Sequence, residues 1–176
     1  MRITLFISFL FLSVSVFSQS SFPESWLGKY EGNLEIYSVD SIAMNLKMNL
    51  DIIKTEKDSV FQWVITYDFK GKEDIRSYEL IVVDKQKGHY QIDEKNSIVI
   101  DAYFRNEIFT SFFSVSEVFI LATYTMNKEK AIVFEIISAK TKAVSSTGGT
   151  KIDEEEIPIV ASYLVNGRQK AVLISK

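Results

Sequence analysis

The stretch IAMNLKMNLDI, residues 42–52, decides the fold class of this 176-residue chain. Its even-numbered positions, from Ile42 to Ile52, are all apolar, and the odd-numbered positions from Asn45 to Asp51 are polar or charged. At about 180° per residue the apolar side chains share one face of a strand, whereas at about 100° per residue they would scatter around a helix. The stretch therefore predicts a β-strand with one buried face.

The same period of two recurs along most of the chain, and short charged segments separate the runs. Residues 54–58, 70–74 and 85–88 have the length and composition of hairpin loops, so sequential strands should pair as antiparallel neighbours. We therefore predict an all-β antiparallel meander of about ten strands. The expected strands lie within residues 25–38, 42–52, 59–69, 76–84, 89–93, 97–105, 107–126, 130–138, 159–165 and 169–175.

Residues 107–126 are the most apolar part of the chain beyond its first twenty residues. A membrane-spanning helix is one interpretation, but Glu107, Glu117 and several hydroxyl side chains interrupt the run. The β-branched and aromatic composition favours two strands joined by a turn at residues 114–117. No membrane span is therefore expected in the mature chain.

Two segments near the C-terminal end carry separate expectations. Residues 139–156, AKTKAVSSTGGTKIDEEE, have no sustained apolar period and are expected to form a long surface loop. Such a loop is the part of the chain best suited to a lid or a contact segment. Residues 166–167 are Asn-Gly between two apolar runs, a pattern typical of a two-residue hairpin turn.

Ten sequential antiparallel strands leave two open edges unless the sheet closes on itself. Short connections and strands of similar length favour closure into an up-and-down barrel. A β-sandwich is the alternative, but it would normally need longer crossovers than residues 139–156 alone supply.

The opening WLGKYEGNLEIY, residues 26–37, followed by meandering strands, resembles the start of lipocalin-like (calycin) barrels. Those barrels place a Trp and a Gly in the first strand and close the barrel base with them. Here Trp26 precedes Gly28, the reverse of the usual lipocalin order, and residues 39–42 leave no room for the two helices of fatty-acid-binding relatives. The resemblance implies a barrel whose first strand forms its base and closure, with Gly28 and Gly32 permitting the bend.

Residues 1–18 have the layout of a secretory signal peptide, with Arg2 before a long apolar run and small or short residues before the expected cleavage after Ser18. The ending Phe-Ser-Gln, residues 17–19, resembles signal peptides of Gram-negative bacteria of the Bacteroidota type. The expected result is an exported protein, periplasmic or secreted, with residues 19–176 as a single β-barrel domain. An uncleaved anchor helix is the alternative, although the apolar run is shorter than the roughly 20 residues that a membrane span needs.

Composition excludes several classes of protein. The chain has no cysteine, so it cannot carry the acylated Cys of a bacterial lipoprotein or any disulfide. Loss of residues 1–18 would leave 19 basic and 23 acidic side chains, and this mild acidity argues against nucleic acid as a partner.

Few residues offer catalytic or metal chemistry. His89 is the one histidine, so the usual zinc sets cannot form, and no Gly-x-Ser-x-Gly elbow accompanies the serines. A haem-ligand role for His89 and a calcium site at residues 153–156 are alternatives to a strand-end histidine and a solvated acidic loop. Residues 147–151, TGGTK, lack the spacing of a phosphate-binding loop. We therefore expect a protein that is not an enzyme, without a metal or cofactor.

Aromatic side chains on the expected inward faces are the remaining candidates for function. With about ten strands, a barrel could leave room for a small apolar ligand, or the rings could simply fill the core. The first hypothesis is a non-catalytic lipocalin-like protein that binds a small apolar or amphipathic molecule. The second is a cell-envelope interaction module with a filled barrel and contacts on residues 139–156. The candidate ligand-binding residues are Trp63, Tyr67, Tyr78, Tyr90, Phe112, Tyr124 and Phe134.

Overall fold

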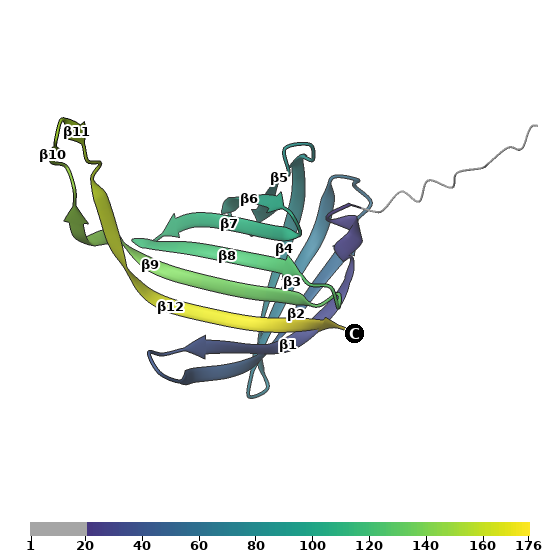
Figure 1. Ribbon diagram of the computed structural model, residues 1–176. Coiled ribbons are helices and arrows are strands. Elements are labelled where there is room, and N and C mark those ends of the chain that lie inside the picture. The colour runs from purple at the N-terminus through teal and green to yellow at the C-terminus, as the bar shows by residue number, and fades with distance from the viewer. Residues whose placement is uncertain (1–20) are drawn as a thin grey trace, which may run out of the picture.

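The computed structural model describes residues 21–176, and the expected signal peptide lies outside the described residues. The described chain is a β-barrel with a short 3₁₀-helix at one end and a hairpin that projects from the other (Figure 1). Its elements are η1 (Glu24–Trp26), β1 (Gly28–Tyr37), β2 (Ile42–Lys54), β3 (Val60–Phe69), β4 (Lys72–Asp84), β5 (His89–Asp93), β6 (Val99–Arg105), β7 (Ile108–Val115), β8 (Val118–Met126), β9 (Ile132–Thr147), β10 (Lys151–Ile152), β11 (Glu155–Glu156) and β12 (Val160–Ser175).

Ten of these strands form a closed antiparallel barrel in the order β1-β12-β9-β8-β7-β6-β5-β4-β3-β2. From β1 to β9 each strand pairs with its neighbour in sequence, so the predicted meander and its closure are confirmed, and the sandwich alternative is wrong. The two-residue turns Lys70-Gly71, Asn106-Glu107 and Ser116-Glu117 have positive φ at both residues, as tight hairpins between twisted strands require.

The barrel closes where β1 meets β12. Tyr30 lies opposite Ser175 and Leu34 lies opposite Ala171, so the first strand is the closure strand, as predicted. Between these pairs the two backbones come very close, because a Cβ atom on Gly32 would lie 2.1 Å from the carbonyl oxygen of Val172. Only a residue without a side chain allows this approach.

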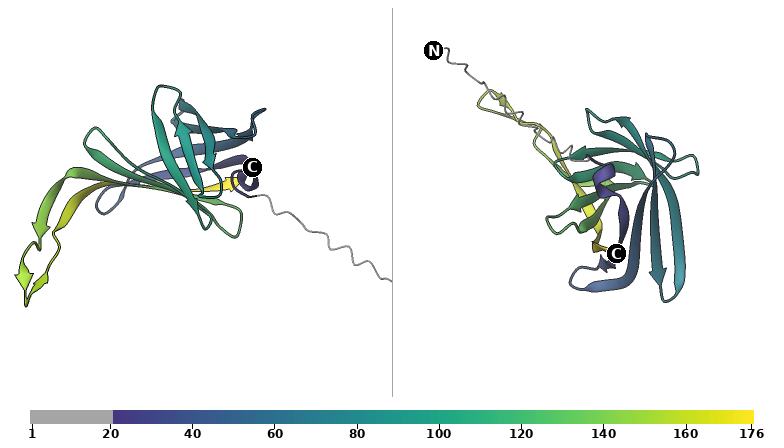
Figure 2. Two further views of the ribbon diagram at one scale, coloured as in Figure 1. Left: turned by 90° about the horizontal axis from the view of Figure 1, so that it is seen from above. Right: turned by 90° about the vertical axis from the view of Figure 1, so that its right-hand side faces the viewer.

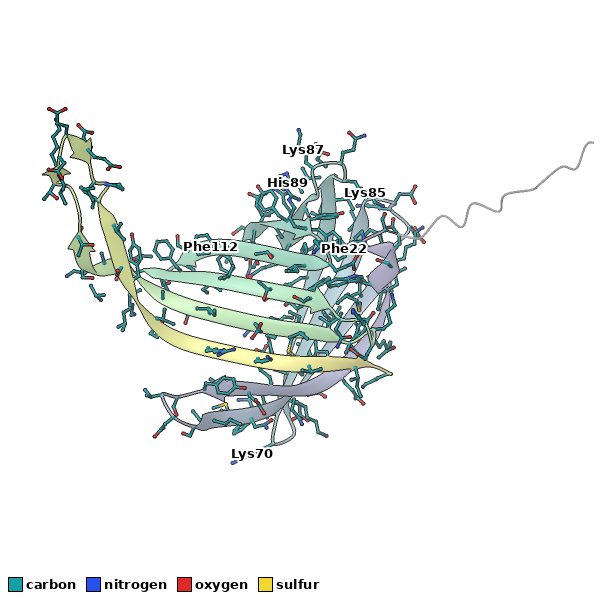
Figure 3. All side chains as sticks on the ribbon, viewed as in Figure 1. Phe22, Lys70, Lys85, Lys87, His89 and Phe112 are labelled. Atoms are coloured by element: carbon teal, nitrogen blue, oxygen red, sulfur yellow. The ribbon has the colours of Figure 1, made fainter. Side chains whose placement is uncertain are left out.

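An aromatic cluster, here called the base cluster, fills one end of the barrel. Phe22 stacks on Phe104 at 4.4 Å between ring centroids and meets Trp26, Tyr90 and Phe109, each at 5.0 Å. Two hydroxyl groups hold the entering chain, because Tyr90 donates to the carbonyl of Phe22 and Tyr30 to that of Trp26. The base cluster therefore plugs the end of the barrel opposite the projecting hairpin, where Figure 3 labels Phe22.

The expected long loop at residues 139–156 is wrong. β9 continues to Thr147 and pairs there with Val160, so most of this segment forms one half of a long hairpin that leaves the barrel (Figures 1 and 2). We call residues 139–167 the arm. Its turn lies at Asp153-Glu154, where φ is +48° and +71°, with β10 and β11 paired beside it.

The expected C-terminal hairpin at Asn166-Gly167 is also wrong, because both residues lie inside the continuous strand β12. The register between β9 and β12 shifts around Tyr163, Val165 and Gly167, so the pair is accommodated as an irregularity in a paired strand. An Asn-Gly pair permits a tight turn but does not require one where the flanking strands find other partners.

We expect Gly32→Ala to lower the free energy of unfolding by about 3 kcal/mol, because the new methyl group has no space beside the Val172 carbonyl. Urea unfolding monitored by circular dichroism measures the change. Gly71→Ala is the control: no atom lies within 4 Å of its Cβ position, so only the left-handed backbone penalty of about 1 kcal/mol applies. Equal losses in the two variants would show that the close approach does not control barrel closure.

Candidate functional site

A cavity of about 290 Å³ lies inside the barrel, between the base cluster and the end from which the arm projects. Along each strand, successive inward-facing side chains lie progressively farther from the base of the barrel. On β3, Phe61 and Trp63 are buried near the base, and Tyr67 lies closest to the open end; on β4 the same order is Leu80, Tyr78 and Arg76. The base half of the barrel is therefore filled, and the half near the arm is hollow.

Aromatic rings form the floor of this cavity. Trp63 is only 1% exposed and meets Tyr124 edge-on at 5.1 Å, while Tyr124 lies 4.8 Å from Phe134. Phe109 packs against Trp63 at 5.4 Å and connects this floor to the base cluster. A ligand in the cavity would therefore rest on a rigid, apolar and fully packed surface.

Small side chains on two adjacent strands create the hollow. Ser111 on β7 lies directly opposite Ala122 on β8, and both line the cavity. Larger side chains at this pair would extend into the same space, since inward positions of a barrel of this size are otherwise filled by side chains. The cavity therefore depends on the small size of these two residues.

The open end of the cavity carries polar groups. Arg76 donates from Nε and Nη2 to Oδ2 of Asp74, at 3.2 and 3.1 Å, and its guanidinium lies 5.2 Å from the centre of the Tyr67 ring. Tyr78 and Glu94 complete this polar end. Asp74 uses two of the five donors of Arg76, so others remain for an acceptor group on a ligand.

Burial controls the ionisation of the tyrosines that line the cavity. Desolvation raises the pKa of Tyr67 to about 12, against an opposing effect of the nearby Arg76 cation. Burial likewise raises the pKa of Tyr78 and that of Tyr124. Near neutral pH all three hydroxyls are therefore neutral groups that can donate or accept a hydrogen bond.

The structure brings most of the predicted ligand-binding residues together. Tyr90 faces inward but belongs to the base cluster, away from the cavity. The expectation that Phe112 faces inward is wrong: its side chain is 65% exposed on the outside of β7, and Phe113 lines the cavity instead. The predicted residues that do line the cavity are Trp63, Tyr67, Tyr78, Tyr124 and Phe134.

Several cavity residues were not singled out from the sequence. Arg76 could have been found, because it is two residues from Tyr78 on one strand and so shares its inward face. Ser111 and Ala122 carry no signal of their own, since a small residue gains meaning only once its neighbours around the barrel are known. Phe109 was obscured by the apolar residues on both faces of β7.

His89 lies on the outside of the barrel. Its Nε2 atom is 2.7 Å from Oδ1 of Asp101, and its ring stacks on Tyr103 at 5.0 Å. The hydrogen bond from His89, followed by one from Gln91, lowers the pKa of the Asp101 carboxyl group. This geometry places the one imidazole away from the cavity, so a haem held there by His89 is not supported.

A larger hollow of about 900 Å³ lies on the outer surface near the base, around the residues Lys85, Lys87 and His89 labelled in Figure 3. Its lysines are paired, Lys85 with Glu24 at 3.1 Å and Lys87 with Asp84 at 3.2 Å. Arg105 also lines this hollow, and its Nη1 donates to the carbonyl oxygens of Gly88 and Phe104, at 3.2 and 2.8 Å, rather than to a carboxylate. Within residues 21–176 no group of three or more His, Cys, Asp or Glu side chains is placed to hold a metal ion.

A scan of the chain against protein-family models gave no match, and a search of curated proteins gave none either. The fold and cavity define the class as a closed ten-stranded antiparallel meander barrel, an architecture consistent with lipocalin-like proteins. In the described part of the chain, no helix has the length and apolar character needed to cross a membrane.

The raised pKa of Tyr67 predicts a loss of stability at alkaline pH. A tyrosine in the unfolded chain ionises near pH 10, whereas the folded Tyr67 ionises near pH 12, so its stabilising effect is complete below about pH 10 and disappears as the pH rises to about 12. We expect Tyr67→Phe to remove up to about 2–3 kcal/mol of this pH dependence in urea unfolding. Tyr163→Phe, at an exposed position on the arm, is the control, and equal pH dependence in both variants would contradict the assignment.

Proposed function

We propose that this protein binds one small amphipathic molecule in the barrel cavity and performs no catalysis. The observation that carries the proposal is the contrast within one barrel: a fully packed base and a hollow half with aromatic walls and a polar end. At about 290 Å³ the cavity is near the lower limit of about 300–1,000 Å³ for small-molecule sites. The ligand is therefore small, or only its apolar part enters the barrel.

The orientation of the ligand follows from the two ends of the cavity. The apolar part would contact Trp63, Tyr124 and Phe134, where nearly all the surface is aromatic. The polar part would lie near Arg76 and Tyr78, whose donors suit a carboxylate, carbonyl or hydroxyl oxygen. This arrangement resembles that expected of a lipocalin-like carrier more closely than that of an enzyme, because no nucleophile–base pair lines the cavity among the described residues.

A cavity-filling variant tests the binding proposal. We expect Ala122→Leu to weaken binding of a hydrophobic fluorescent probe at least about tenfold, or about 1.4 kcal/mol, because the larger side chain occupies the space beside Ser111. Ala43→Leu, an equal change at an exposed position on β2, should bind as the wild type does. Unchanged binding to a folded Ala122→Leu protein would place the probe outside the cavity.

The variant Arg76→Met tests whether the polar part of the ligand contacts the guanidinium. It preserves much of the apolar stem of the side chain and removes the guanidinium, so a probe with a carboxylate should lose affinity while a neutral probe of similar shape should not.

A mass spectrum of protein purified under native conditions and then denatured identifies any bound molecule. Absence of a bound molecule, together with no probe binding by the wild type, would reject the proposal.

We also propose that the protein is exported, as residues 1–18 suggest. The expected product in the host cell is a mature chain that begins at Gln19 and is recovered from the periplasmic fraction or the medium. The intact mass of the protein in each fraction measures this. A full-length chain found only in the cytoplasm would contradict both cleavage and export.

A second candidate function is that of a cell-envelope interaction module. The arm favours it, because a hairpin that leaves the barrel contributes nothing to the cavity and exposes apolar side chains to solvent. The two functions are compatible, since the cavity and most of the arm are formed by different residues.

A further inference from the structure

The pairing between β6 and β7 stops before either strand ends. Among the described residues, these strands pair only over the segment of β6 from Ala102 to Arg105, on the side of the base. β6 nevertheless begins at Val99 and β7 continues to Val115, because each keeps its other neighbour, β5 or β8 (Figure 1). The wall of the barrel is therefore parted toward the end from which the arm projects, and we call this gap the split.

The split begins beside the hollow of the barrel. Ser111 belongs to the last pair between β6 and β7, and it lies opposite Ala122, with which it creates the cavity. If the register continued, the next inward residues to face each other would be Ile100 and Phe113. Both of these residues line the cavity and also a groove on the outer surface. At the split, therefore, side chains rather than paired backbones separate the interior from the groove.

This outer groove follows the split and is largely apolar. Its volume is about 480 Å³, larger than that of the cavity, and both facing segments, residues 98–101 and 112–115, line it. Val99 is 50% exposed there and Phe112 is 65% exposed. Outward positions of a barrel in water are normally polar, so such a surface indicates that another molecule covers it.

The continuity of the groove with the cavity identifies that molecule as the ligand of the cavity. The two spaces share four lining residues, Glu94, Ile100, Phe113 and Val115. At the packing density of protein interiors, a cavity of about 290 Å³ encloses about 220 Å³ of molecule. An apolar chain too long for this space would therefore leave the cavity through the split and cover the groove.

The charges decide which end of the ligand lies in the groove. Glu94 and Asp101 line the groove, and Asp101 accepts hydrogen bonds from His89 and Gln91, at 2.7 and 3.1 Å. No basic side chain of the described residues lines it, whereas Arg76 lies at the polar end of the cavity. A head group that carries acceptor oxygens is therefore repelled from the groove and attracted to Arg76, so the apolar end of the ligand occupies the groove.

We propose that the split is a side opening of the binding site and that the outer groove is its second subsite, so that the ligand is a single-chain amphiphile longer than the cavity. Its polar head lies near Arg76, its chain crosses the hollow beside Ser111, and its apolar end covers Val99 and Phe112. This inference rests on the proposed binding function. It adds the length of the ligand and the route by which the chain leaves the interior.

Two straight-chain carboxylates of different length test the route. Octanoate fits within the cavity, whereas palmitate exceeds it and would extend into the groove. Isothermal titration calorimetry with each carboxylate, below the concentration at which it forms micelles, measures the two affinities. We expect the wild type to bind palmitate at least about a hundredfold more tightly than octanoate, because each further methylene group removed from water contributes about fourfold.

Charged substitutions in the groove distinguish this route from any other. Val99→Asp and Phe112→Asp should each weaken palmitate binding at least about tenfold and leave octanoate binding unchanged, because only the longer chain reaches these positions. Val172→Asp is the matched control: Val172 is 47% exposed on the outside of β12, and this variant should bind both carboxylates as the wild type does. Octanoate binding also shows that each variant is folded.

The outcomes separate this inference from the binding function on which it rests. The inference alone is wrong if the hydrophobic fluorescent probe binds but palmitate binds no more tightly than octanoate, or if palmitate keeps its affinity in either groove variant. A groove that palmitate does not reach would then be covered by another protein. Both proposals are wrong if the probe and the two carboxylates all fail to bind.

Discussion

The structure depends on the approach of β1 to β12, because this contact turns a strip of ten strands into a closed barrel. Closure requires the Val172 carbonyl to reach Gly32, which only a glycine permits. Once the edges meet, every second side chain of every strand points into a common interior, and the depth of each residue follows from its distance along the strand. Closure of the barrel therefore produces both the base cluster and the cavity. Large inward side chains fill the barrel at one end, and smaller ones leave a hollow at the other.

The division between a filled base and a hollow end has a simple physical origin. At the base, Phe22 enters the barrel from the N-terminal segment and is held among rings from β5, β6 and β7, so little space remains. Toward the arm no segment of residues 21–176 enters the barrel, and Ser111 and Ala122 are too small to meet the opposite wall. Arg76 is found at this end because its guanidinium can reach both Asp74 and water, which a site nearer Trp63 would not allow. The cavity is therefore graded from apolar to polar along the barrel axis.

The period of two in the sequence predicted the class of fold and the meander, because those features bury one face of each strand. The closure strand was predicted from the resemblance of residues 26–37 to lipocalin-like barrels. The pattern failed where a strand pairs with its neighbours without burying just one of its two faces. The arm has no apolar period since neither of its faces is covered, yet its backbone pairs from Ala139 to Thr147, so it was mistaken for a loop. Phe112 and Phe113 are consecutive rings on a strand with apolar residues on both faces, and the pattern could not decide which of them faces inward. The small residues that open the cavity could be recognised only from their position opposite larger ones.

The arm restores the unpaired strand edges that closure of the barrel removes. Closure removes strand edges from the sheet, but the extension of β9 and β12 beyond their neighbours creates two new ones. Ordinary protection by lysines is present on β9 and absent on β12, where the exposed residues are apolar. An edge without protection invites indiscriminate aggregation unless something limits what can pair with it. Pro158, which has no backbone N–H to donate, and the register shifts against β9 around Tyr163 and Val165 limit that pairing, because both interrupt the row of hydrogen-bonding groups along the edge.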